Sequence, residues 1–161
     1  MISLPYPAPQ VHLPCDGGFK VNLADLKPSS VVLFFYPRDN TSGCTVEAKT
    51  FTAFLPEFEA LDAKVIGISK DSVKSHNNFI HKQELKVQLM SDADSDVCEK
   101  FDVWKKKSMY GKTFFGIERS TFLINAEGQV VREWRKVKVP GHVKAVLNAV
   151  KFLQHKRKNV K

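Results

Sequence analysis

Residues 31–51, VVLFFYPRDNTSGCTVEAKTF, decide the fold of this chain. Six consecutive apolar residues, Val31 to Tyr36, predict a strand buried on both faces, as a central strand of a parallel sheet is. A loop of turn-forming and small polar residues follows, and the stretch from Cys44 to Leu61 predicts a helix. Because proline lacks a backbone donor and clashes with the preceding turn, we expect a kink or break at Pro56. The loop therefore delivers a single thiol, that of Cys44, to the start of a helix.

The length and composition limit what the chain can be. Its 161 residues suit one domain whose core needs no disulfide cross-links, and three cysteines do not form a disulfide framework. No apolar run reaches the ~18 residues of a membrane-spanning helix. The first ten residues, MISLPYPAPQ, lack a secretory-signal pattern, and their prolines predict an extended lead-in over 1–10. We therefore expect a cytoplasmic protein without a membrane partner.

The basic charge suggests a polyanionic partner, which we disfavour. Part of the formal net charge of +8 lies in Lys105 to Lys107 and in residues 155–161. Such a surplus attracts nucleic acid, but no nucleic-acid-binding motif accompanies it. We interpret 105–107 as a solvated loop and 155–161 as a solvated basic tail. The HKRK run at 155–158 leaves a weak nuclear signal as an alternative to the cytoplasm.

Strand and helix signals alternate along the rest of the chain. Further strands are predicted at 64–69, 87–90, 120–125 and 129–134, the last two forming a hairpin. Further helices are predicted from Asp71 or Ser72 towards His81, around Val97 to Phe101, and from Pro140 onwards. An N-terminal hairpin is predicted from 11–13 and 19–23. This order of elements favours an α/β sandwich with a mixed sheet.

The position of Cys44 suits a reactive cysteine. The thiolate is the nucleophile, and the free N–H groups and dipole of a helix N-terminus stabilise it. Thr41 offers a hydroxyl that can donate to the sulfur or accept from a protonated substrate oxygen, and Gly43 allows a substrate close to the backbone. Pro37 fixes the chain direction after the strand, and Glu47, which we place in the first helical turn, complements the dipole. A lone cysteine here also fits a small buried apolar role, so both interpretations stay open on this motif alone.

Three blocks of the sequence resemble the peroxiredoxins. The pattern Pro37-xxx-Thr41-xx-Cys44 is similar to the peroxidatic motif of that family, and the surrounding FFYPRDNTSGCTVEA resembles its bacterioferritin-comigratory, or Q-type, branch. The blocks SDADSDVCEKFDVW, at 91–104, and GKTFFGIERSTFLINAEG, at 111–128, are similar to the same branch. The likeness runs from about Val11 to Val150 and covers nearly the whole chain.

The resemblance implies a thiol peroxidase with a thioredoxin-like, three-layer sandwich over 11–154. Cys44 would attack the O–O bond of hydrogen peroxide or an organic hydroperoxide and become a sulfenic acid. Thr41 and the loop backbone would orient the peroxide, and Arg119 would stabilise the thiolate and the charge that develops on the peroxide oxygens. Glu47 would hold Arg119 in place. The implied reductant is a thioredoxin-like protein or a small thiol, and we predict no cofactor, no metal site, and a monomer or weak dimer.

The chain departs from this branch in its resolving cysteine. Many members carry a second cysteine five residues after the first, where this chain has Lys49. Others carry it on the next helix, near Phe79 and Ile80, where this chain has none. Cys15 falls in the predicted hairpin turn, and Cys98 shares an apolar helical face that is more typical of a core. We favour a one-cysteine cycle resolved by an external thiol and keep a two-cysteine cycle with Cys98 as the alternative.

Two other function classes stay open at this point. A thiol–disulfide oxidoreductase on the same fold is disfavoured because no Cys-x-x-Cys occurs. A nucleic-acid-binding module that uses the basic tail is disfavoured because no aromatic residues are interleaved with the basic ones.

Overall fold

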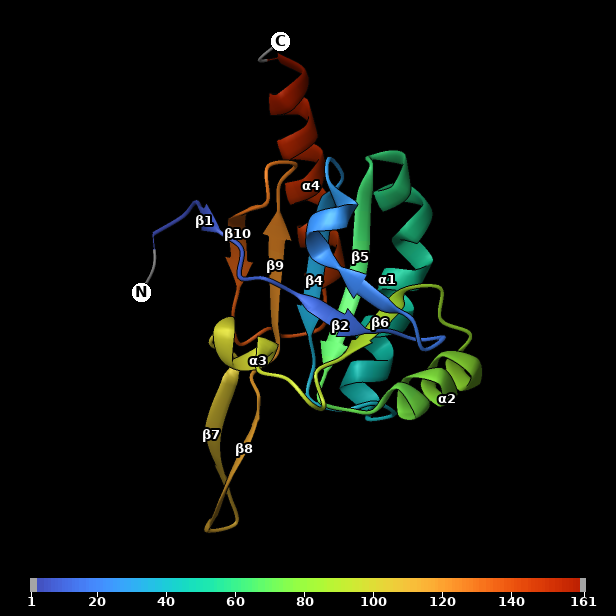
Figure 1. Cartoon of the computed structure of the whole chain (residues 1–161), viewed down its shortest axis with the longest axis vertical. Helices are drawn as coiled ribbons and strands as arrows, with labels where there is room; N and C mark the ends of the chain where they lie inside the picture. The colour runs from blue at the N-terminus through green and yellow to red at the C-terminus, as the bar shows by residue number, and fades with distance from the viewer. Residues whose placement is uncertain (1–2, 160–161) are drawn as a thin grey trace.

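A six-stranded mixed sheet forms the centre of the molecule (Figure 1). A computed structural model describes residues 3–159 of the chain, and it describes side chains for residues 3–156. The strands run in the order β1 (Tyr6–Pro7), β10 (Gln129–Trp134), β9 (Ser120–Ile124), β4 (Ser30–Phe35), β5 (Ala63–Ser69) and β6 (Gln88–Ser91). β4, β5 and β6 are parallel, whereas β9 is antiparallel to both β4 and β10. The α/β class and the mixed sheet predicted from the sequence are confirmed.

β4 is buried along its whole length and divides its side chains between two cores. Val32 and Phe34 belong to one cluster, while Val31, Leu33 and Phe35 belong to the other. The alternation arises because successive side chains of a strand point to opposite faces of the sheet. The sheet therefore separates the two cores.

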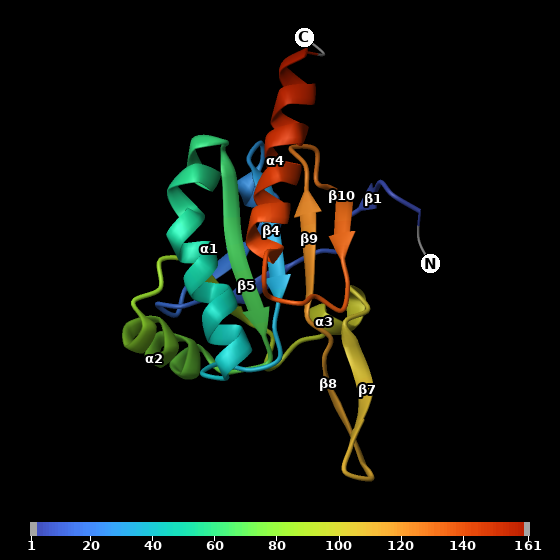
Figure 2. The same cartoon turned by 180° about the vertical axis from the view of Figure 1, so that it is seen from behind.

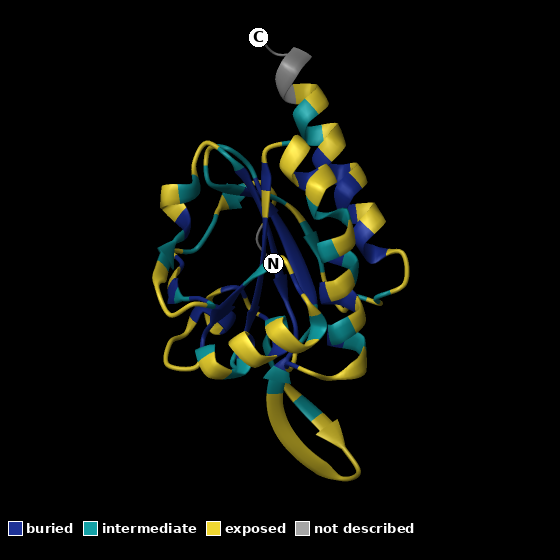
Figure 3. Ribbon diagram, turned by 90° about the vertical axis from the view of Figure 1, so that its right-hand side faces the viewer, coloured by how far each residue is buried: buried dark blue, intermediate teal, exposed yellow. Residues whose placement is uncertain are grey.

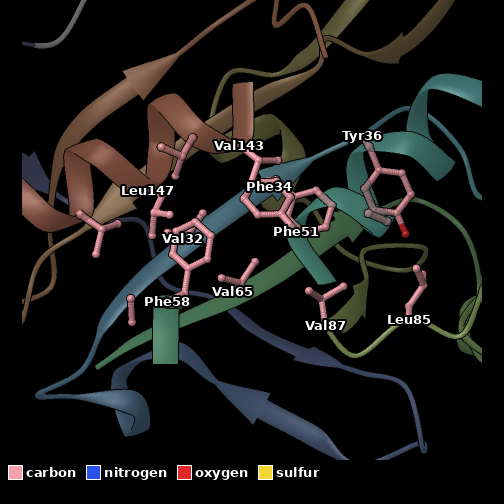
Figure 4. Packing of buried hydrophobic residues seen from close by; sticks show 14 of the residues in the cluster. Val32, Phe34, Tyr36, Phe51, Phe58, Val65, Leu85, Val87, Val143 and Leu147 are labelled. Carbon is pink, nitrogen blue, oxygen red and sulfur yellow. The ribbon is translucent and has the colours of Figure 1, made fainter. Parts of the chain in front are cut away.

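The first core lies under α1 (Ser42–Ala60) and α4 (His142–Asn159), which cover one face of the sheet (Figure 2). Phe34 stacks on Phe51 with ring centroids 4.6 Å apart, and Phe51 lies 5.9 Å from Phe58 (Figure 4). α4 contributes the buried apolar stripe that its sequence predicts, Val143, Val146, Leu147 and Val150.

The second core lies on the opposite face of the sheet. It is covered by the N-terminal hairpin of β2 (His12–Pro14) and β3 (Lys20–Asn22), by the 3-10 helix η1 (Leu23–Leu26) and by α3 (Val97–Lys100). The predicted hairpin is confirmed, and it docks on β6 through a bridge between Cys15 and Met90. Cys15 and Cys98 are both fully buried in this core.

Two helix predictions need correction. The predicted break at Pro56 is absent, because α1 continues across Pro56, which lies on the exposed side of the helix, where the loss of one backbone hydrogen bond is tolerated. α4 begins at His142 instead of Pro140, because Gly141 has a φ of 76°, outside the helical region. α2 (Val73–Gln83) begins as predicted, with the Ser72 hydroxyl accepting from the Ser75 N–H.

Residues 104–117 form a hairpin that projects from the body (Figures 1 and 3). β7 (Trp104–Met109) and β8 (Lys112–Ile117) make a separate two-stranded sheet, so Lys105 to Lys107 lie in a strand and not in the loop we expected. The distal part of the hairpin is exposed, with Tyr110 97% accessible. Arg119 follows β8 by two residues, so the base of the hairpin leads directly into the site described below.

The segments near both ends of the described chain belong to regular elements. Tyr6 and Pro7 of the N-terminal lead-in pair with β10, and residues 155–159 continue α4. Residues 160–161 of the expected basic tail lie outside the described residues, as do the side chains of 157–159. Between residues 3 and 159, no helix has the length and apolarity to cross a membrane.

Gly67 in β5 lies where an added methyl group would collide with the core. A Cβ there would stand 2.6 Å from Cζ of Phe34 and 2.8 Å from Cδ2 of Leu89, both fully buried. Gly67→Ala should therefore lower the free energy of unfolding by ~1–3 kcal/mol, measured by chemical denaturation. Gly116→Ala is a matched control, because its Cβ would lie 3.4 Å from the flexible Lys107 side chain. Equal losses in the two variants would contradict the close packing at Gly67.

Candidate active site

The loop between β4 and α1 places Cys44 in the first turn of α1. Thr41 is the N-cap, α1 begins at Ser42, and Cys44 is its third residue. The backbone N–H groups of a first turn have no partner within the helix, so they are available near the sulfur. Cys44 is only 1% exposed, whereas Pro37, which ends the run of apolar residues, lies at the surface.

Thr41 is positioned beside this turn with its hydroxyl proton already engaged. Its Oγ1 donates to the Arg38 carbonyl at 2.9 Å, and its own carbonyl accepts from the Thr45 N–H. The predicted donation from Thr41 to the sulfur is therefore not made in this conformation. The oxygen of Thr41 remains an acceptor for a protonated substrate oxygen.

Arg119 joins Cys44 to Glu47. It lies between β8 and β9, and its carbonyl accepts from the Val137 N–H. Its Nη2 donates to the Cys44 Sγ at 3.3 Å, and its Nη1 donates to the Glu47 Oε1 at 2.6 Å. Gly43 has no side chain, and a Cβ added there would stand 3.2 Å from Nη2 of Arg119. Gly43 therefore makes room for the guanidinium itself.

Glu47 differs from our prediction in position and in environment. Because α1 begins before Cys44, Glu47 lies in the second helical turn, too far along to act on the dipole as expected. Its side chain is fully buried, and Oε2 has no hydrogen-bond partner in the described part of the chain. Burial raises the pKa of Glu47 to about 7, although Arg119 alongside lowers it. Burial lowers the pKa of Arg119, but the charges of Glu47 and Cys44 more than offset this, so its pKa is raised and it stays cationic.

The resulting site suits a small electrophile. A fixed cation contacts a buried sulfur, and the N-terminus of a helix adds a positive potential at the same atom. Such donors stabilise negative charge as it moves from the sulfur to a substrate oxygen.

Comparison with known proteins identifies the family. The AhpC/TSA family matches residues 5–133. Peroxiredoxin Bcp of Xanthomonas campestris is 50% identical over 151 residues, which cover 94% of each protein. A solved structure of the bacterioferritin comigratory protein of that organism, described for its alkyl peroxide reduction activity, is 51% identical with a TM-score of 0.85, over 89% of this chain and 92% of that one. The chain belongs to the peroxiredoxin family, in its Bcp or Q-type branch. It is a thiol peroxidase with a thioredoxin-like fold.

A more distant peroxiredoxin is relevant to the reducing step. The yeast mitochondrial 1-Cys peroxiredoxin, described as resolved through glutathione and thioredoxin systems, is 25% identical with a TM-score of 0.83. The match covers 98% of this chain and 79% of that one.

The other two cysteines of this peroxiredoxin lie across the sheet from Cys44. Cys44 belongs to the core under α1 and α4, whereas Cys15 and Cys98 belong to the core on the opposite face. Burial, followed by the charge of Asp16, raises the pKa of Cys15 to about 11. Burial, followed by the charge of Asp92, raises the pKa of Cys98 still further. Neither thiol is ionised near neutral pH, and neither contacts Cys44.

Sequence reasoning missed two groups of polar residues near the site. Tyr36, Asp39 and His76 form a buried hydrogen-bonded cluster behind the loop that carries Cys44. His142 lies at the start of α4, with Nε2 at 2.8 Å from the Thr121 hydroxyl, and burial, assisted by Arg119, lowers its pKa to about 4. The sequence signal for the first group was a tyrosine that ends an apolar strand three residues before an aspartate.

The raised pKa of Glu47 predicts a pH-dependent stability. The folded protein holds a proton on Glu47 up to about pH 7, while the unfolded chain releases it near the usual value of 4.5. This stabilisation is full below pH 4.5 and falls as the pH rises to about 7, by roughly 3 kcal/mol in total at 1.36 kcal/mol per pKa unit. Glu47→Gln should remove that part of the slope, measured by urea denaturation between pH 4.5 and 8. Identical slopes in the two proteins would place the Glu47 pKa at its ordinary value.

Proposed function

We propose that Cys44 is the peroxidatic nucleophile of this thiol peroxidase. Its thiolate attacks one oxygen of a hydroperoxide, an S–O bond forms as the O–O bond breaks, and Cys44 becomes a sulfenic acid. The other oxygen leaves as an alkoxide or hydroxide and takes up a proton to give an alcohol or water. The contact of Nη2 of Arg119 with Sγ of Cys44, at 3.3 Å, carries this proposal.

Each neighbouring side chain has its own role in the proposed reaction. Arg119 holds the thiolate and stabilises charge on the peroxide oxygens, because its guanidinium can address more than one atom at once. Glu47 fixes the Arg119 side chain by their 2.6 Å contact. Thr41 accepts a hydrogen bond from the protonated peroxide oxygen, and Pro37 directs the loop away from β4. Hydrogen peroxide and organic hydroperoxides are the substrate class.

Substitutions of Arg119 and Cys44 test the roles proposed for these two residues. Arg119→Met should slow the oxidation of Cys44 by hydrogen peroxide by ~10²–10³, because a charge-stabilising donor is lost. Arg119→Lys should recover only part of the rate, since a point charge lacks the fork of donors. Stopped-flow measurement of a single turnover gives these rates, with Cys44→Ser as the inactive reference. A near-normal rate for the Met variant would contradict the role of Arg119 in the reaction. Peroxide turnover by the Ser variant would contradict the assignment of Cys44 as the nucleophile.

We further propose a one-cysteine cycle with an external thiol reductant. An intramolecular disulfide requires Cα atoms within ~7 Å, and the central sheet stands between Cys44 and the other two thiols. An external thiol would attack the sulfur of the sulfenic acid and release water to leave a mixed disulfide. A second thiol would then free Cys44 and leave as a disulfide with the first. The yeast relative, named for glutathione and thioredoxin systems, supports a small thiol or a thioredoxin-like protein as reductant.

Replacement of the remaining cysteines tests this cycle. Cys15→Ser and Cys98→Ser should each keep turnover with hydrogen peroxide and a small dithiol within about twofold of the unmodified protein, because neither thiol contacts Cys44. Peroxide alone should leave a sulfenic acid at Cys44 that a trapping reagent labels, and excess peroxide should oxidise it further. Peptide mapping after one equivalent of peroxide reads the outcome. A dominant disulfide from Cys44 to Cys98 or Cys15 within one chain would establish the two-cysteine cycle instead.

The domain boundaries, the compartment and the oligomeric state are also proposals. We propose a peroxiredoxin domain over 11–154 with a lead-in at 1–10 and a basic tail at 155–161, acting in the cytoplasm as a monomer or weak dimer. The three unpaired cysteines support a reducing compartment. The relative from Xanthomonas campestris is a bacterial protein, so it gives no support to a nuclear signal at residues 155–158. Membership of the peroxiredoxin family supports a thiol peroxidase over the thiol–disulfide oxidoreductase and nucleic-acid-binding alternatives as the main function.

A further inference from the structure

The hairpin of β7 and β8 carries large apolar side chains into solvent. Every residue from 108 to 115 is exposed, and the hairpin stands clear of the body (Figure 3). Tyr110 is 97% exposed, while the exposure of Met109, Phe114 and Phe115 lies between 44% and 58%. These four residues are half of the large apolar residues that are exposed in the described chain. Apolar surface concentrated in this way is typical of an interaction site.

The same segment is basic and contains no acidic residue. Residues 104–117 include four lysines and neither aspartate nor glutamate. Two of the lysines, Lys105 and Lys107, already bind neighbouring groups of the chain. The ammonium groups of Lys106 and Lys112 have no hydrogen-bond or ion-pair partner in the part of the chain that the structure describes. Two positive charges are therefore available to a partner.

The register of the hairpin sets each of these free lysines beside an apolar side chain. Lys106 lies opposite Phe115, and Lys112 lies opposite Met109. Residues directly opposite in an antiparallel pair share a face, and successive residues alternate between faces, so the two pairs lie on opposite faces of the hairpin. Trp104 stacks on Phe115 with ring centroids 6.2 Å apart and extends the first of these faces. Both faces of the hairpin therefore combine apolar surface with positive charge.

This two-sided character favours one kind of partner. A nucleic acid is held mainly by many phosphate contacts, whereas this hairpin offers two free ammonium groups. A rigid protein surface would cover one face of the ribbon and leave the other in water. The headgroup layer of a bilayer surrounds whatever enters it, and aromatic side chains settle at that depth. Anionic headgroups also complement free lysines.

We propose that the β7–β8 hairpin binds the surface of an anionic lipid bilayer. The apolar side chains at and near the tip lie among the headgroups, while Lys106 and Lys112 contact the lipid phosphates. The hairpin stays at headgroup level, because the outer edges of a two-stranded sheet carry backbone groups that hydrocarbon cannot satisfy. Our expectation of no membrane partner followed from the lack of a spanning segment, which a peripheral contact does not require.

Binding through the hairpin fixes which end of the molecule faces the bilayer. The hairpin projects from the end at which β4 finishes and α1 begins, whereas α4 finishes at the opposite end (Figures 1 and 2). The loop that carries Cys44 therefore lies at the membrane-facing end. Exposed residues of the last turns of α4 point away from the bilayer and provide matched controls.

Charge removal tests the electrostatic half of the contact. Lys106→Gln combined with Lys112→Gln should weaken binding of the full chain to vesicles of phosphatidylglycerol and phosphatidylcholine in equal parts roughly 25-fold, at about fivefold per lysine. Lys151→Gln combined with Lys156→Gln removes the same charge from exposed positions of α4 and should weaken binding less than about threefold in ~0.1 M salt. Co-sedimentation measures both affinities, and vesicles of phosphatidylcholine alone should bind little protein.

Removal of an aromatic ring tests the apolar half. Phe115→Thr keeps a strand-forming residue and should weaken vesicle binding by about tenfold, because a large side chain no longer leaves water. Phe152→Gln is the control, since Phe152 is 69% exposed on α4 and glutamine suits a helix. It should bind like the unmodified protein. The difference between the two variants should persist at roughly 0.5 M salt, where charge attraction is screened.

A fluorescent residue at the tip locates the contact directly. Tyr110→Trp should show an emission maximum that moves to shorter wavelength when vesicles are added, because the indole enters the headgroup layer. Phe152→Trp should show no such shift. Trp104 and Trp134 are common to both variants, so the difference reports the introduced indole. Circular dichroism and thermal unfolding establish that each variant is folded at the assay temperature.

Several results would overturn the inference. Equal losses of vesicle binding in the hairpin variants and in the α4 controls would reduce the contact to general charge attraction. An unshifted Tyr110→Trp spectrum in vesicle-bound protein would place the contact elsewhere. Hairpin variants that reduce self-association in sedimentation velocity, or binding to a single-stranded DNA oligonucleotide, while vesicle binding is unchanged would assign the hairpin to a second copy of the chain or to nucleic acid instead.

Discussion

The site depends on one buried hydrogen-bonded pair, that of Glu47 and Arg119. Burying a carboxylate beside the guanidinium is costly, which is why the Glu47 carboxyl keeps its proton up to about pH 7, and the cost is offset only where the geometry is close and other groups complete the hydrogen bonding. Here Arg119 completes its bonding with the sulfur of Cys44, while Oε2 of Glu47 is left without a partner in the described chain. The pair is therefore maintained at some cost in stability. Its consequence is that the guanidinium, which could otherwise turn to solvent, is held on the sulfur of Cys44.

The second constraint is the central sheet. Because β4 is buried on both faces, it divides the cysteines of the chain between two cores on opposite faces of the sheet. The thiol at the start of α1 contacts Arg119, and the two thiols across the sheet are kept neutral by burial. The same strand that leads to Cys44 therefore separates it from the other two thiols.

Much of the fold followed from local sequence patterns. The apolar run before the loop gave the central strand, and helical spacing gave the buried stripe of α4, because in both cases burial repeats with the period of the element. The break predicted at Pro56 was wrong because helix propensity does not take account of packing. On the exposed side of a packed helix, a proline costs little more than one backbone hydrogen bond. The hairpin at 104–117 was missed because most of its residues are exposed, so no alternation of burial marked it.

The candidate site was predictable only in part for a related reason. Cys44 and Thr41 lie in one motif whose local spacing carries information. Arg119 and its contact with Glu47, which spans 72 positions and depends on the sheet, were expected only from the resemblance to the family. The buried state of Asp39 could not be anticipated, because its partners come from α2 and from the loop before it. A polar residue in a turn looks solvated until the element that covers it is placed.

The missing resolving thiol and the anchored loop fit together physically. α2 carries no cysteine, and its first turn is instead tied to the loop through Ser75 and His76. A helix that delivered a thiol to Cys44 would have to leave its place and break these buried bonds, each costly to leave unmade. A helix without such a thiol has no need to do so. The proposed resolution by an external thiol would leave these bonds between α2 and the loop intact.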